Sequence, residues 1–346
     1  MSAPPLAAAP RAPRSPWQRL YTAAHAWRRR RAATRARRLP RPVVSVGNLH
    51  WGGTGKTPLT AALAAHLRDQ GRAVAVLSRG YRGSTRKPLL VSRGDGPLVT
   101  AELAGDEPVA LALALPGVAV AVGRDRAAAG HLALATLEPP PDLFLLDDGF
   151  SHVQLARDLD LLAVPESDPF GGGRLPPSGR LREPLASARH AHALLLTGAT
   201  ASPEGARAVA AALAPFGFVG PGFACPTAIG QPHRAEHGEP LAAGSPVLLV
   251  AGIARPERFL AAATASGMRV AGTQLFADHH AYPEPSLRAI RLAFGRSGAT
   301  MVLTTAKDQV KLGDRLGLPI AVLPVSAAPE AAFWAWLDGA LRRIAG

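Results

Sequence analysis

Short apolar runs alternate with longer Ala- and Leu-rich stretches along most of the chain. Five runs have the length of a buried strand: residues 42–46, 73–77, 118–122, 143–146 and 159–164. Between the first two runs, Leu59, Leu63 and Leu67 recur at helical spacing, and Pro58 suits the first turn of that helix. The alternation predicts an α/β fold in which helices cover both faces of a mostly parallel sheet.

A glycine-rich loop separates the first predicted strand from the first predicted helix. It consists of His50, Trp51, Gly52, Gly53, Thr54, Gly55, Lys56 and Thr57. At such a junction the backbone N–H groups converge on an anion, and the helix N-terminus adds partial positive charge. The pattern predicts a P-loop in which Lys56 contacts the β and γ phosphates of ATP and Thr57 binds Mg²⁺. The usual pattern has glycine where His50 stands, and we expect the extra glycines to supply the flexibility.

The apolar pattern loosens once and then restarts, which predicts two domains. With 346 residues the chain suits this number. New runs begin near residue 246, and residues 165–185, rich in Pro, Gly and Arg, are typical of a long functional loop. We predict four segments: a basic amphipathic arm (1–41), a P-loop domain (42–222), a linker (223–245) and a smaller C-terminal α/β domain (246–346).

The net charge of +14 is concentrated at one end of the chain. Residues 1–41 contain eleven arginines and no acidic residue, and the rest is close to balanced. One helical face of this arm is apolar and is followed directly by Arg28–Arg31: it carries Trp17, Leu20, Tyr21, Ala24 and Trp27. The pattern favours either a helix lying on an anionic membrane surface or a solvated arm, with an organelle transit peptide as a third alternative.

Three acidic or histidine-rich clusters are candidates for the chemistry. Asp147 and Asp148 end an apolar strand, where carboxylates either bind magnesium or cap a turn. Asp106 and Glu107 open a predicted helix, and on spacing alone helix capping is the simpler interpretation. The cluster around His279 is by itself typical of a solvated turn, because metal sites use other ligand spacings.

The ordered motifs together resemble the tetraacyldisaccharide 4′-kinase family of Gram-negative bacteria. The resemblance covers about residues 42 to 312 and includes Val46-Gly47-Asn48 with the P-loop, Leu77-Ser78-Arg79-Gly80-Tyr81, Gly105-Asp106-Glu107-Pro108, Val122-Gly123-Arg124-Asp125-Arg126, Asp147-Asp148-Gly149-Phe150-Ser151-His152, Leu181-Arg182-Glu183-Pro184, Gly252-Ile253-Ala254-Arg255-Pro256, Asp278-His279-His280 and Thr304-Thr305-Ala306-Lys307-Asp308. The family usually has glutamine at the position of Ser151 and often glutamate at that of Ala306.

The resemblance implies transfer of the ATP γ-phosphate to the 4′-hydroxyl of a tetraacylated glucosamine disaccharide 1-phosphate. It implies a peripheral enzyme at the cytoplasmic face of the bacterial inner membrane. The basic arm would then bind the enzyme to this membrane. It also implies that Asp106 is the catalytic base, assisted by His279, and that Asp147 and Asp148 lie beside magnesium. Further active-site positions are matched by Glu107, Arg126, His152 and Arg182.

Rival interpretations explain fewer of these residues. A partitioning-type ATPase would share the P-loop and the strand-tip aspartate but would not need a second domain for an acceptor. A GTPase would need an Asn-Lys-x-Asp segment, and in Thr305-Ala306-Lys307-Asp308 the lysine is misplaced. A nucleic-acid binder would depend on the basic arm alone, so we expect no nucleic-acid partner. The sequence does not define an oligomeric state.

Overall fold

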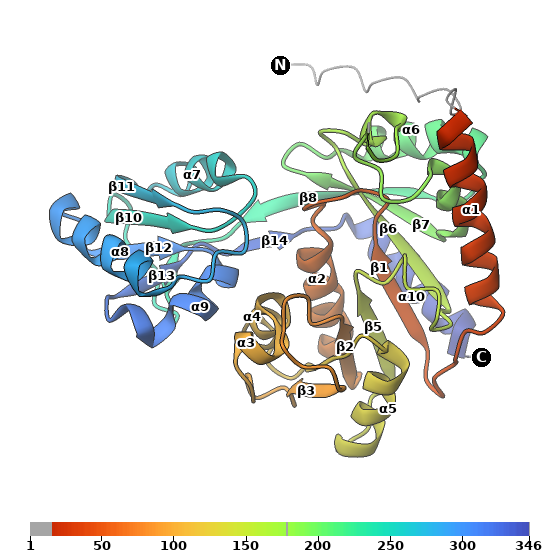
Figure 1. The fold of residues 1–346 in the computed structure, drawn as a ribbon, viewed down its shortest axis with the longest axis horizontal. Helices are drawn as coiled ribbons and strands as arrows, with labels where there is room; N and C mark the ends of the chain where they lie inside the picture. Colours follow the sequence, from red (N-terminus) through yellow and green to blue (C-terminus); the bar gives the residue numbers. More distant parts are fainter. Residues whose placement is uncertain (1–15, 178, 346) are drawn as a thin grey trace.

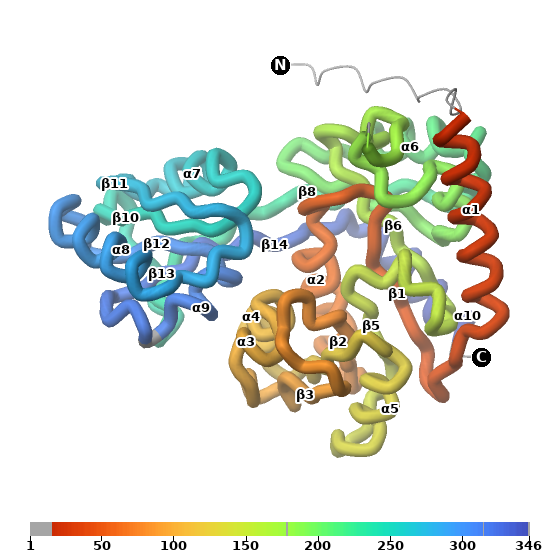
Figure 2. The backbone as a smooth tube through the Cα atoms, in the orientation of Figure 1, coloured from red at the N-terminus to blue at the C-terminus, as the bar shows by residue number. Residues whose placement is uncertain are grey.

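The computed structural model of the chain describes residues 16–177 and 179–345. Two α/β units lie side by side, each built on its own sheet, and both ends of the described chain belong to the larger unit (Figures 1 and 2). The predicted fold class, with a mostly parallel P-loop sheet and a smaller second α/β unit, is confirmed.

Within the described residues the larger sheet has nine strands in the order β14-β8-β7-β6-β1-β5-β2-β4-β3. All strands from β8 to β4 are parallel, and only the edge strands β3 and β14 run antiparallel to their neighbours. Their bounds are β1 (Val43–Gly47), β2 (Val74–Ser78), β3 (Leu89–Ser92), β4 (Ala119–Val122), β5 (Leu143–Asp147), β6 (Leu159–Pro165), β7 (Ala193–Gly198), β8 (Gly222–Ile229) and β14 (Val325–Ala327).

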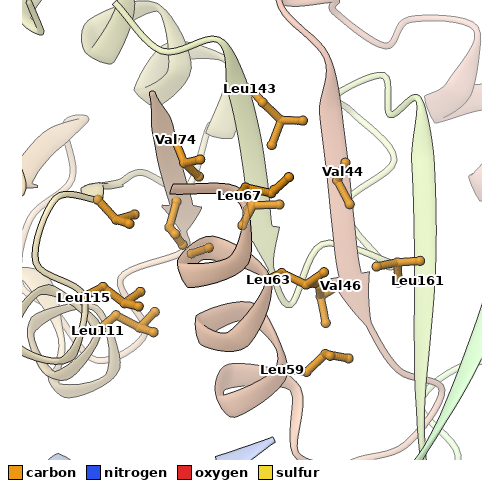
Figure 3. Close-up of a cluster of buried hydrophobic side chains, with 14 of the residues drawn as sticks. Val44, Val46, Leu59, Leu63, Leu67, Val74, Leu111, Leu115, Leu143 and Leu161 are labelled. Atoms are coloured by element: carbon orange, nitrogen blue, oxygen red, sulfur yellow. The ribbon is translucent and has the colours of Figure 1, made fainter. Parts of the chain in front are cut away.

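Helices cover both faces of this sheet, because successive strand residues point to opposite sides. From β1, Val44 and Val46 pack in one apolar cluster with Leu59 and Leu63 of α2 (Figure 3), whereas Val43 joins the opposite cluster with α5. The helical segments of this unit are α1 (Pro16–Ala33), α2 (Lys56–Asp69), α3 (Ala101–Ala104), α4 (Asp106–Ala114), α5 (Arg126–Thr136), α6 (Pro203–Leu213) and α10 (Ala331–Ala345), with short 3-10 turns at Gly171–Gly173, Leu185–His190 and Ala214–Phe216.

The smaller sheet has the order β11-β10-β12-β13-β9, and only the edge strand β9 is antiparallel. An apolar cluster on one face includes Phe259 of α7, and a second cluster includes Leu287 of α8 and Leu312 of α9. The bounds are β9 (His233–Arg234), β10 (Pro246–Ala251), β11 (Arg269–Leu275), β12 (Met301–Thr304), β13 (Ile320–Val322), α7 (Pro256–Ala265), α8 (Glu284–Ser297) and α9 (Ala306–Leu316).

Two predicted boundaries differ from the observed sheets. The expected linker, residues 223–245, contains β8 of the larger sheet and β9 of the smaller one, so only part of it connects the units. The expected C-terminal domain, residues 246–346, ends earlier, because β14 and α10 return to the larger unit. Phe333 and Leu337 of α10 are buried in the same cluster as α2, and this burial explains the return.

The predicted helix in the basic arm is present as α1, which lies along the larger unit (Figure 1). Trp17, Leu20 and Trp27 are 55%, 63% and 61% exposed. The opposite side of α1 is anchored by Arg29, which is 8% exposed and donates hydrogen bonds to the Phe150 carbonyl (3.0 Å) and to Glu183 (3.1 Å). Residues 1–15 of the predicted arm lie outside the described residues. In the part that the structure describes, no helix has the length and apolarity to cross a bilayer.

Candidate active site

The glycine-rich loop lies where β1 ends and α2 begins, as predicted. Gly55 has φ 76°, a left-handed conformation that glycine adopts without a Cβ penalty. Thr54 is held from two sides: its hydroxyl accepts a hydrogen bond from the Asn48 amide (2.7 Å), and its carbonyl accepts one from the Thr197 hydroxyl (2.8 Å). These contacts fix the loop conformation before any anion arrives, so little ordering is left to binding.

The first two residues of the predicted loop have different environments. His50, at the usual glycine position, is 4% exposed and pairs through its backbone with Leu181. Burial lowers the pKa of the His50 imidazole, so it is neutral at physiological pH. Trp51 is exposed, and its backbone N–H donates to the Arg180 carbonyl (2.9 Å). A neutral, enclosed His50 therefore places no charge beside the loop.

The paired aspartates stand at the end of β5, next to the P-loop. Val46 of β1 pairs with Asp147, so the adjacent carboxyl ends of β1 and β5 bring the acids to the start of α2. Asp147 is buried and accepts hydrogen bonds from Thr60 (3.2 Å) and, at the long limit, from Thr57 (3.5 Å). Asp147 therefore lies within hydrogen-bond distance of Thr57, and the assignment of these residues to magnesium stays a prediction.

The two aspartates have opposite electrostatic environments. Burial, and next the charge of Asp148, raise the pKa of Asp147 to about 6. Burial acts in the same direction on Asp148, but its pKa is lowered overall by hydrogen bonds from Arg182 and by the charge of Lys56. Arg182 binds Asp148 through two guanidinium nitrogens (2.8 and 2.9 Å), and Lys56 Nζ lies 3.6 Å from Asp148 Oδ1. Asp148 thus stays ionised, while Asp147 titrates near neutrality.

The oxygen atoms of Thr57, Asp147 and Asp148 suit a magnesium ion better than a softer metal. Among the described residues no group of three or more His, Cys, Asp or Glu side chains could hold a metal by itself. A magnesium ion at this position would therefore need further oxygen ligands from water or phosphate, which is its usual mode of binding.

We expect the affinity for nucleotide with magnesium to fall below about pH 6. The raised pKa of Asp147 means that its carboxylate takes up a proton as the pH falls through 6, and a metal ligand must be deprotonated. The expected slope is about ten-fold per pH unit, as for competition by one proton. The measurement is the affinity for nucleotide with magnesium between pH 7.5 and 5.0, in wild-type protein and in Asp147→Asn. The variant is the control, because only protonation of the nucleotide changes its affinity in this range. Parallel profiles for the two proteins would contradict the assignment.

A third group of residues joins the two units. Asp106 begins α4 directly after Gly105, whose φ of 94° and close approach to the Tyr81 carbonyl (2.6 Å to an added Cβ) require glycine. Asp106 is 7% exposed, and its Oδ2 lies 3.1 Å from Nδ1 of His279 in the smaller unit. His279 has φ 60°, and its carbonyl accepts a hydrogen bond from Arg82 (3.1 Å). The solvated-turn interpretation of the histidine cluster is therefore wrong for His279.

Two lysines of α9 complete this contact. Lys307 Nζ lies 3.1 Å from His279 Nε2, and Lys311 Nζ lies 3.5 Å from Asp106 Oδ2. A lysine ammonium only donates, so Nε2 of His279 accepts and its Nδ1 carries the proton that is donated to Asp106. Burial would raise the pKa of Asp106, but the charges of Lys307 and Lys311 and the hydrogen bond from His279 lower it overall. Asp106 is consequently an ionised carboxylate at neutral pH.

The remaining predicted residues lie around the same edge of the larger sheet. Arg126, at the start of α5, contacts His152 (Nη1 to Nδ1, 3.4 Å). Burial, and next the charge of Arg79, lower the pKa of Arg126 to about 10; burial and Arg126 lower that of His152 to about 4. Burial, followed by the charge of Asp147, raises the pKa of Glu107. The structure thus surrounds the strand ends with a neutral histidine and cationic arginines.

Several contacting residues were not predicted from the sequence. Lys307 belongs to a motif quoted above, yet neither it nor Lys311 was assigned a role. Asn48 and Thr60 support Thr54 and Asp147, and only their positions beside the P-loop could have indicated this. Ser151, at the usual glutamine position, donates a hydrogen bond to Glu183 and so retains a polar contact there.

The fold and site define a P-loop kinase with two α/β units. A family model described as tetraacyldisaccharide-1-P 4′-kinase (LpxK) matches residues 12–342. The chain is 42% identical to tetraacyldisaccharide 4′-kinase of Geobacter metallireducens over 84% of this chain and 85% of that protein, and 42% identical to that of Geobacter sulfurreducens over 86% and 81%. It therefore belongs to the tetraacyldisaccharide-1-P 4′-kinase family, as its motifs predict.

A solved structure of the same family has the same fold. The crystal structure of the "apo" form of LpxK from Aquifex aeolicus in complex with ATP matches with a TM-score of 0.75 and 31% identity. The match covers 95% of this chain and 97% of that one.

Proposed function

We propose that the chain transfers the γ-phosphate of ATP to the 4′-hydroxyl of a tetraacyl glucosamine disaccharide 1-phosphate, a step of lipid A synthesis. Membership of the family supports the reaction. The contact that carries the site assignment is the one between Asp106 and His279, since it joins the two units beside the P-loop. An acceptor held between the units would have its hydroxyl near Asp106 and its phosphate donor near Lys56.

The P-loop residues would hold the donor. Gly52 to Gly55 would surround the phosphates with backbone N–H groups, and Lys56 would contact the β and γ phosphates. His50 and Trp51 would border this loop, since the Trp51 N–H already donates to the Arg180 carbonyl. Thr57, Asp147 and Asp148 would bind Mg²⁺. When bound, the magnesium ion would neutralise charge on the β and γ phosphate oxygens. The Lys56 ammonium group lies 3.6 Å from Asp148, and on ATP binding it would turn to the phosphates. Arg182 would then keep Asp148 ionised.

Asp106 would take the proton of the acceptor hydroxyl. In the same step the hydroxyl oxygen would form a bond to the γ-phosphorus, and the bond between the γ-phosphorus and the β–γ bridging oxygen would break. ADP leaves with the bonding electrons, and the proton ends on Asp106 or on solvent. The Nδ1–H of His279 orients one carboxylate oxygen (3.1 Å), and Lys307 fixes that tautomer. Arg126 and Arg182 would neutralise charge on the transferring phosphoryl group, with Glu107 and His152 completing the site.

The direct test is incubation of the protein with γ-labelled ATP and the disaccharide lipid in detergent. A labelled bisphosphorylated lipid supports the proposal. Release of labelled inorganic phosphate without labelled lipid would favour the ATPase alternative. Omitting the lipid supplies the control, because a kinase that uses this acceptor has little turnover without it.

We further propose that α1 places the enzyme on the anionic cytoplasmic face of the bacterial inner membrane. Trp17, Leu20 and Trp27 are each more than half exposed, and Arg28 and Arg31 lie exposed beside them. The Trp17 indole N–H also donates a hydrogen bond to the Pro176 carbonyl (3.4 Å). Aromatic side chains beside arginines suit the interface of an anionic bilayer. The acceptor has four acyl chains, so an enzyme at this surface would meet it without extracting it from the membrane.

We expect the triple change Trp17→Ser, Leu20→Ser and Trp27→Ser to weaken binding to anionic vesicles by at least about ten-fold, since each large apolar side chain contributes on the order of 1 kcal/mol or more at the interface. A sedimentation assay at two salt concentrations is the measurement. The matched control replaces Val219, Leu260 and Leu292, which are exposed elsewhere, by serine. Deleting residues 1–41 is a poorer test because it removes the buried Arg29. Equal loss in both triple variants would contradict the assignment to α1.

A further inference from the structure

A cavity lies between the second half of α1 and the body of the larger unit, and no residue of the P-loop lines it. It has a volume of about 320 Å³, within the range of ligand pockets. Ala26 and Ala33 of α1 and Leu155 from the opposite wall supply apolar surface. The charged and titratable lining residues are Arg29, Arg30, Arg157, Asp160, Arg189 and His190. Four guanidinium groups thus face a space that contains one carboxylate.

Two of the arginines have their charge satisfied within the protein. Arg157 pairs with Asp160 (Nε to Oδ1, 3.0 Å), and Arg29 pairs with Glu183 (3.1 Å). Arg30 and Arg189 are exposed, and among residues 16–177 and 179–345 neither forms an ion pair with an acid. The lining therefore has an excess of positive charge that no described acidic side chain neutralises.

The lowered pKa of His190 agrees with the excess of positive charge in the cavity lining. Burial, followed by the charges of Arg29 and Arg189, lowers the pKa of His190 to about 4. Its neutral Nε2 lies 3.3 Å from Nε of Arg189, so the imidazole accepts from the guanidinium and leaves the terminal nitrogens of Arg189 for another acceptor. A bound anion would relieve the repulsion among these cations.

The position of the cavity separates it from the exposed apolar face of α1. Ala26, Arg29, Arg30 and Ala33 line the cavity from α1, and they lie on the side of the helix that faces away from Trp17, Leu20 and Trp27. Of the cavity residues, Arg30 is the nearest to the apolar face, because it follows Trp27 by three residues. The cavity is therefore distinct from the surface that we propose to lie on the membrane.

We propose that this cavity is a binding site for a phosphate ester, with Arg30 and Arg189 as its anion ligands. One guanidinium group can donate two parallel hydrogen bonds to two oxygens of the same phosphate. Its planar arrangement of N–H groups suits a phosphate ester, which has three terminal oxygens. The alanine and leucine surface leaves room for the alcohol portion of the ester. A phospholipid headgroup and a soluble sugar or glycerol phosphate present the same chemistry.

The soluble arm of the test uses sn-glycerol 3-phosphate in a calorimetric titration of the full chain. Wild-type protein is expected to bind it saturably, and Arg30→Gln with Arg189→Gln is expected to weaken binding by at least about ten-fold. The matched control is Arg35→Gln with Arg41→Gln, which removes two exposed charges outside both the cavity lining and the proposed membrane face of α1. Thermal unfolding of both variants checks that they fold.

The lipid arm uses vesicles of phosphatidylcholine that contain either phosphatidic acid or phosphatidylglycerol, matched for surface charge. Tighter binding to phosphatidic acid that is lost only in the Arg30/Arg189 variant identifies a lipid headgroup as the ligand. Saturable glycerol phosphate binding without vesicle selectivity identifies a soluble ester. No saturable binding in either arm, or equal losses in both double variants, would overturn the proposal. Neither arm involves ATP or the acceptor, so failure here is distinguishable from failure of the proposed kinase activity.

Discussion

Replacing Lys56 by methionine is expected to lower turnover by about 10²- to 10³-fold and to weaken ATP binding. Methionine keeps most of the apolar length of the side chain but removes the ammonium group at the start of α2. That group lies 3.6 Å from Asp148 and is the cation nearest to it after Arg182. The triphosphate would then face the carboxylates without its own countercharge, and the phosphoryl group would lose a cation in the transition state.

The measurement for this variant is steady-state kinetics with the lipid acceptor, together with nucleotide affinity. Lys87→Met is the matched control, because Lys87 is exposed and lies outside the loop. If Lys56→Met bound nucleotide and made product like its parent, then the loop would not hold phosphate, and the proposed mechanism would be wrong from its first step.

Replacing Asp106 by asparagine is expected to lower kcat by about 10²- to 10⁴-fold while nucleotide affinity stays within a few-fold of wild type. Asparagine preserves the size of the side chain but cannot take the hydroxyl proton. Asp106 does not contact the P-loop lysine, so nucleotide binding should survive. The change also removes the negative charge that Lys311 and His279 contact across the units, although Lys307 keeps Asp278 (3.4 Å) and Lys311 keeps Asp308 (3.2 Å) as partners. The contact between the units therefore weakens.

Separating these two effects requires both kcat and KM for the lipid. Loss of the base lowers kcat, whereas a weakened contact between the units raises KM for an acceptor held between them. Asp95→Asn, at an exposed position on the same unit, is the control. A variant with normal kcat and raised KM would exclude Asp106 as the base and leave it only a positioning role.

The parts of the fold predicted from sequence are those with a local signal. The strands β1, β2, β4, β5 and β6 are mostly apolar runs, interrupted only by Ser45 in β1 and Asp160 in β6 before their last residues, and the loop before Lys56 contains three glycines. Parallel order then brings Asp147 to the P-loop, because adjacent parallel strands end at the same edge. This part of the site needed only sequence pattern and the geometry of a parallel sheet.

Other parts depend on contacts between distant segments. Pro226 interrupts the apolar run of β8, so its first residues looked like a linker, although they pair with β7. Nothing local in α9 distinguishes Lys307 and Lys311 from solvated lysines. They face Asp106 because the smaller unit folds back onto α4. Likewise, the apolar face of α10 indicates burial but not which sheet it covers.

The return of β14 and α10 to the larger sheet has a consequence for the order of folding during synthesis. Phe333, Leu337 and Leu341 of α10 fill a core whose other members come mostly from residues 44–225, so this core cannot close until the ribosome has released α10. The smaller unit is complete by β13 and can form before that moment. Until then the nascent larger unit exposes the apolar side of β1 and α2. A chaperone that binds hydrophobic surface would bind the chain at these residues.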